Sequence, residues 1–111
     1  MDNLILLKDI YLSNEMAKII RKYKPYIDLS EYKIYDVGDL PLNLSRLDSV
    51  IEAITNDKVL PPVDLKIIKL YRPPRKKTEN DKMYFSILNG RHRVVASIIS
   101  NHTHIRAKLF N

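Results

Sequence analysis

The sequence predicts a single compact domain of mixed α/β class, with a small mixed sheet and helices packed on it. Two segments carry apolar residues at helical spacing, several shorter segments alternate apolar and polar residues, and turn residues separate them. The chain has 111 residues, enough for one hydrophobic core but too few for two. Apolar residues make up 45% of it, so a core can form and disorder is not expected.

Residues 1–31 are expected to form an N-terminal extension ahead of the main domain, residues 32–111. Within the extension, Leu4 to Leu7 fit either a short strand or the start of a helix. Ser13 is a candidate N-cap for a helix that runs to about Tyr23, because its hydroxyl can accept a hydrogen bond from the first turn. One interpretation of this extension is a dimerisation element.

The first half of the main domain is expected to hold a strand and an amphipathic helix. Tyr32 to Val37 is rich in β-prone residues, and Gly38-Asp39-Leu40-Pro41 follows it as a turn. The helix should run from Arg46 to Asn56, with Asn43 or Ser45 as its cap. Its apolar stripe consists of Leu47, Val50, Ile51 and Ile54.

Three strands and a buried helix are expected in the second half. The strands are Val63 to Tyr71, Met83 to Leu88 and Ile105 to Phe110, each with alternating side chains. Between the last two, the helix Arg91 to Ser100 is apolar nearly all round and should be mostly buried. Asn101 suits the left-handed conformation in which helices often end. This order of elements is typical of a mixed α/β domain.

The charge of the chain favours an anionic partner. The formal net charge is +6 and the pI is about 9.6, which suits nucleic acid or nucleotides. The alternative is a lysine- and isoleucine-rich composition that has nothing to do with a ligand.

The chain has no cysteine, which excludes disulfides, thiolate metal sites and cysteine nucleophiles. Its apolar runs fall well short of the roughly 20 residues of a membrane helix. The opening residues carry an acid where a signal peptide carries basic residues. The sequence therefore predicts a soluble, cytoplasmic protein without a membrane partner.

The strongest local signal is Asn89-Gly90-Arg91-His92-Arg93, between a predicted strand and a predicted helix. A helix N-terminus presents free N–H groups and about half a positive charge. The cationic side chains of Arg91 and Arg93 would repel that end unless an anion joined them, so the motif favours a bound phosphate. The alternative is a basic turn whose arginines face water.

The same region resembles a known family. Val59-Leu60-Pro61-Pro62-Val63-Asp64, then Tyr84-Phe85-Ser86-Ile87-Leu88 leading into the motif, then Ile105-Arg106-Ala107-Lys108-Leu109, is similar to sulfiredoxin and to the ParB N-terminal domain. The resemblance covers about Val37 to Phe110. It implies a ParB/sulfiredoxin fold and a nucleotide-phosphate site. Residues 1–31 have no counterpart in this resemblance.

The resemblance also implies particular site residues. In sulfiredoxin a His-Arg pair at the helix start holds ATP phosphates, and this pair matches His92 and Arg93. A Lys and a Ser on the preceding helix assist there, and Arg46 and Ser49 stand at their positions. The family's Thr one turn further on is Ala53 here. The resemblance does not specify the nucleotide; ATP and CTP, with or without Mg²⁺, are the candidates.

Arg91 marks the main departure from sulfiredoxin, whose catalytic Cys stands at this position. Reduction of a sulfinate needs a thiolate there, so the resemblance does not extend to sulfiredoxin activity. An arginine adds positive charge and is closer to the Arg-rich ParB motif.

We therefore expect a phosphate-, nucleotide- or DNA-binding domain that uses Gly90, Arg91, His92, Arg93, Arg46 and Ser49. The alternative is an enzyme, either a ParB-like nuclease or a small phosphotransferase or NTPase. Charge-stabilising groups are present but no general base is evident, so no catalytic residue is assigned. A third hypothesis is that the domain mediates protein–protein interactions and has no affinity for anions.

A basic loop from Arg72 to Lys82 contains five basic and two acidic residues. Arg72, Arg75, Lys76 and Lys77 are candidate contacts to a nucleic-acid backbone. The alternative is a solvated hairpin tip.

No metal site is predicted. His102 and His104 alone do not make up the three or four ligands of a metal centre and fit a surface turn. Asp48 and Glu52, one turn apart on the amphipathic helix, would suit Mg²⁺ beside a phosphate or a solvated face.

Overall fold

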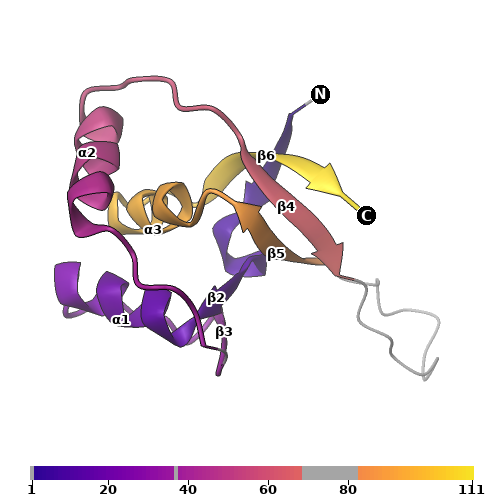
Figure 1. Cartoon of the computed structure of the whole chain (residues 1–111), viewed down its shortest axis with the longest axis horizontal. Coiled ribbons are helices and arrows are strands. Elements are labelled where there is room, and N and C mark those ends of the chain that lie inside the picture. The colour runs from indigo at the N-terminus through magenta and orange to yellow at the C-terminus, as the bar shows by residue number, and fades with distance from the viewer. Residues whose placement is uncertain (1, 37, 69–82) are drawn as a thin grey trace.

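A four-stranded sheet with the strand order β1-β6-β4-β5 forms one side of the molecule (Figure 1). The structure, a computed structural model, describes residues 2–36, 38–68 and 83–111. β1 (Asn3–Leu6) pairs antiparallel with β6 (His104–Phe110), and β4 (Val63–Ile68) runs parallel to β6. β5 (Tyr84–Asn89) completes the sheet antiparallel to β4. The mixed sheet and its helices confirm the predicted mixed α/β class.

A small second sheet lies beside the first. β2 (Tyr11–Ser13) and β3 (Lys33–Tyr35) pair in parallel, and the helix α1 (Asn14–Tyr23) connects them. A short 3₁₀ turn, η1 (Leu7–Asp9), joins β1 to β2. The predicted strand from Tyr32 to Val37 is thus present in shorter form.

Three helices of the described chain gather on the other side, with α3 between α1 and α2 (Figure 1). α1 begins as predicted, because the Oγ of Ser13 accepts a hydrogen bond from the Met16 amide at 3.2 Å. α2 (Leu44–Thr55) is capped by Asn43 rather than Ser45. α3 (Arg91–Ile99) is followed by Asn101 in the predicted left-handed conformation, with φ 65°.

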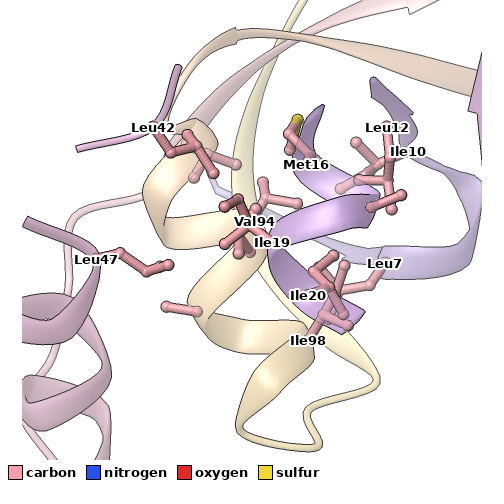
Figure 2. Close-up of a cluster of buried hydrophobic side chains, with 14 of the residues drawn as sticks. Leu7, Ile10, Leu12, Met16, Ile19, Ile20, Leu42, Leu47, Val94 and Ile98 are labelled. Atoms are coloured by element: carbon pink, nitrogen blue, oxygen red, sulfur yellow. The ribbon is translucent and has the colours of Figure 1, made fainter. Parts of the chain in front are cut away.

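The core lies between the helices and extends into the sheet (Figure 2). Ile19 and Ile20 of α1 pack against Val94 and Ile98 of α3. Leu47 reaches the same core from α2 and is fully buried. The expectation of a buried α3 is confirmed, and this burial fixes the direction in which its first turn points.

Residues 1–31 are built into this core. They supply β1 at one edge of the main sheet and all of α1. Leu7, Ile10 and Leu12 are fully buried, and Ile10 forms a parallel bridge to Phe85. Each such side chain stabilises the fold by roughly 1.5–3 kcal/mol. The segment that the sequence set apart as an extension therefore helps to hold residues 32–111 together.

Some predictions fall outside the described residues. The end of the predicted strand Val63 to Tyr71 lies beyond Ile68, and the basic loop with Arg72, Arg75, Lys76 and Lys77 lies there as well. Across the described ranges, every helix is too short or too polar to cross a membrane.

Candidate anion site at the N-termini of α2 and α3

Gly90 stands where β5 ends and α3 begins, and two features of the backbone require a glycine there. Its φ is 112°, in the left-handed region that L side chains rarely adopt. A Cβ at this position would lie 2.5 Å from Cγ1 and 2.9 Å from Cβ of Val63. The glycine thus lets the chain turn sharply while pressed against β4.

The first turn of α3 has no side-chain cap, because its N-cap residue is Gly90. The N–H groups of a first turn have no partner inside the helix, and the helix dipole places partial positive charge on them. In α2, by contrast, the Asn43 side chain accepts a hydrogen bond from the Arg46 amide at 3.0 Å. The α3 N-terminus is therefore the more receptive of the two to an anion.

His92 joins the two helix starts. Its Nε2 accepts a hydrogen bond from the Asn43 amide at 3.0 Å, so the proton of the neutral ring lies on Nδ1. Partial burial, followed by the charges of Arg46 and Arg91, lowers the pKa of His92 below its ordinary value of 6.5. The imidazole is consequently held neutral between two cationic side chains.

Arg91 turns toward the connection between β3 and α2. Its Nη1 lies 2.9 Å from Oδ1 of Asp39 and donates to the Leu40 carbonyl at 2.7 Å. The Asp39 carboxylate also accepts from the Ser13 hydroxyl at 2.9 Å and from the Leu40 amide at 2.8 Å. Ser13, Asp39 and Arg91 therefore connect the starts of α1 and α3.

These contacts also set the charge state of Asp39. Burial works to raise the pKa of this carboxyl, but hydrogen bonds from Ser13, Arg91 and the Leu40 amide, together with the Arg91 charge, hold it below 3.8. Asp39 is thus a stable anion that balances Arg91.

Arg93 points away from His92, toward the connection between α2 and β4. Its Nη1 donates to the carbonyls of Pro61 and Pro62 at 2.7 and 2.8 Å. Nη2 stays near Gly90, 3.2 Å from the position of a Cβ there. Arg93 therefore fastens the proline-containing connection to α3.

The two residues expected on α2 differ in their placement. The positive charge of Arg46 contributes to the lowered pKa of His92. Its side chain is exposed and takes part in none of the ion pairs among the described residues. The Ser49 hydroxyl instead donates to the Ser45 carbonyl of its own helix at 3.1 Å. The structure thus brings Arg46, Arg91 and His92 together, and leaves Ser49 bonded within α2.

The carboxylates considered for Mg²⁺ do not form a ligand cluster. Asp48 accepts a hydrogen bond from the Tyr23 hydroxyl at 2.6 Å, which turns it toward α1. In the part of the chain that the structure describes, no three side chains of the metal-ligating types gather at one point.

The sequence did not reveal that Ser13 and Asp39 hold Arg91 in place at the start of α3. Ser13 was expected as a helix cap and Asp39 as a turn residue. The two residues are 26 positions apart in the chain. An acidic residue in a turn and an unpaired arginine at a helix start are a weak signal for such a contact. Only the tertiary fold places them side by side.

No protein-family model matches the chain, and no curated protein matches it either. The resemblance to sulfiredoxin and ParB therefore stays a prediction that depends on the motif and its surroundings.

Proposed function

We propose that this chain binds a phosphate-bearing ligand, of the nucleotide or nucleic-acid class, where the N-termini of α2 and α3 meet. One observation carries the proposal: His92 of α3 accepts a hydrogen bond from the Asn43 amide at 3.0 Å, which holds the uncapped first turn of α3 beside the start of α2, where Arg46 lies. Asp39 pairs with Arg91, whereas the exposed side chain of Arg46 takes part in none of the ion pairs among the described residues. An anion at this junction would pair with Arg46.

The expected contacts follow from the donors at the junction. The uncapped N–H groups of α3 point along its axis, and such groups bind phosphate oxygens. His92 offers Nδ1–H because Nε2 is already an acceptor. Arg46 adds a charge-assisted hydrogen bond, whereas the guanidinium of Arg93 is engaged with the carbonyls of Pro61 and Pro62. A phosphate needs several donors of this kind in one place.

The overall charge supports an anionic partner. A net charge of +6 raises the rate at which a nucleotide or a DNA strand meets the protein. ATP, CTP and short DNA are the ligands to compare, with and without Mg²⁺. No observation favours the nuclease or phosphotransferase alternative, because Asp39, the carboxylate at the junction, has a lowered pKa and accepts several hydrogen bonds.

Thermal unfolding of the full chain tests the proposal. We expect inorganic phosphate, ATP, CTP or short DNA at low salt to raise the melting temperature. A ligand at 100 times its dissociation constant stabilises by about 2.7 kcal/mol. Arg46→Gln should remove most of this gain. The matched control is Arg21→Gln, an exposed arginine on α1, which should keep it. If none of these ligands shifts the transition, the proposed function is wrong.

A further inference from the structure

A second cleft, away from the α2–α3 junction, lies under the connection from α2 to β4. This connection runs from the end of α2 to the start of β4 (Figure 1). The cleft beneath it has a volume of about 370 Å³. Its walls come from the end of α2 and the connection, the outer face of α3, β1 and the start of β6. Clefts of about 300–1,000 Å³ are of the size that holds small ligands.

Basic residues predominate among the charged groups that line this cleft. Arg93, Arg106 and Lys58 carry positive charge, against Asp57 in the lining and Asp2, which pairs with Arg106 at 3.4 Å; His102 and His104 also line the cleft. They come from α3, β6, the connection and the turn before β6. Such a concentration of one sign favours an anionic group in the cleft.

The two arginines also shape the cleft. Arg93 holds the carbonyls of Pro61 and Pro62, and Arg106 donates to the Leu60 carbonyl from Nη2. These bonds fix the connection at its distance from α3 and β6. The cleft is thus maintained by hydrogen bonds.

Apolar side chains supply the rest of the lining. Ile54 and Ile105 are half-buried, whereas Leu4 and Val59 are 66% and 85% exposed. An exposed large apolar side chain is ordinary by itself, but two that border one cleft form a surface that a ligand can cover. A ligand that fits this lining has an apolar body and one negative charge.

We propose that this cleft binds a small organic anion with an apolar body, of the aromatic carboxylate class. This site is separate from the phosphate site, since Arg46, Arg91 and His92 do not line it, and Arg93 of the motif reaches it only where it bonds to Pro61 and Pro62. The carboxylate would meet Arg106 of β6 and Lys58 of the connection, and the ring would lie against Val59 and Ile105. The proposal does not depend on the proposed phosphate function.

Titration of the full chain with indole-3-carboxylate, followed by ¹H–¹⁵N NMR, tests it. The amide signals of Lys58, Val59, His104 and Ile105 should shift in a saturable way. The neutral isostere indole-3-carboxamide should bind at least about tenfold more weakly. Equal binding of the two compounds, or shifts that fall elsewhere in the protein, would overturn the proposal.

Val59→Glu adds a negative charge at the rim of the cleft without disturbing the core, because Val59 is exposed. We expect it to weaken indole-3-carboxylate binding about tenfold or more, with Val59→Gln as the uncharged control that loses much less. Both variants should keep any response to inorganic phosphate, so failure here is distinguishable from failure of the phosphate site. Unchanged carboxylate affinity in Val59→Glu would count against the cleft.

Discussion

The guanidinium of Arg91 and the carboxylate of Asp39 form an ion pair, with Nη1 and Oδ1 2.9 Å apart. The pair links the first turn of α3 to the connection before α2, and the Ser13 hydroxyl extends the link to α1. About a quarter of each side chain in the pair is exposed, so solvent screens it only in part. One cation of the motif is therefore already neutralised inside the protein.

Asp39 should make stability depend on acid pH. Its folded-state pKa is lowered, so its contribution is complete above the ordinary carboxyl pKa and is lost as the pH falls through the lower folded value. Asp39→Asn should destabilise the protein at neutral pH by roughly 1–3 kcal/mol, since it weakens hydrogen bonds to a charged group. Below pH 4 the difference from wild type should shrink. Melting temperatures between pH 7 and pH 2.5 measure both effects, and a constant difference would contradict this role.

Alanine substitutions at Gly90 and at Gly38 should have different effects on stability. Gly90→Ala should destabilise by about 1–3 kcal/mol or more, because the new Cβ meets Val63 and the residue is held at a positive φ. Gly38→Ala should be neutral or slightly stabilising, because nothing lies within 4 Å of a Cβ there. Chemical denaturation of the two variants measures the contrast. Similar stabilities would show that Gly90 is not under this constraint.

Arg93→Ala should lower stability even without a ligand. The change removes two hydrogen bonds from a charged donor to Pro61 and Pro62, each worth about 1.5–3 kcal/mol at most. Arg21→Ala, on the exposed face of α1, is the control and should change stability by less than about 0.5 kcal/mol. If Arg93→Ala melts at the same temperature as wild type, the hydrogen bonds from Arg93 to Pro61 and Pro62 contribute nothing measurable to stability.

Local sequence patterns predicted the helices and strands because capping and apolar spacing act over a few neighbouring residues. Ser13 caps α1, and Leu47 is buried on the apolar stripe of α2, as the sequence indicates. The pairing of β1 with β6 joins the two ends of the chain, and no local pattern specifies it. This is why residues 1–31 could be read as an extension, although they complete the sheet and the core.

The sequence indicates where the candidate site lies along the chain, but it does not indicate the contacts within it. The change from strand to helix at Gly90 follows from the sequence, and so does the concentration of cationic residues after it. Which arginine would be neutralised depends on Asp39 and on the carbonyls of Pro61 and Pro62, which only the fold brings near.

The pKa of His92, followed by NMR with and without phosphate, tests the central claim most directly. In the free protein this pKa lies below 6.5, because burial and the charges of Arg46 and Arg91 oppose protonation. A bound phosphate places negative charge beside the ring and favours the charged imidazolium, so binding should raise the His92 pKa. In Arg46→Gln, a higher phosphate concentration should be needed to raise this pKa by the same amount. A His92 pKa that stays unchanged at saturating phosphate or ATP and low salt would contradict an anion site at the α2–α3 junction.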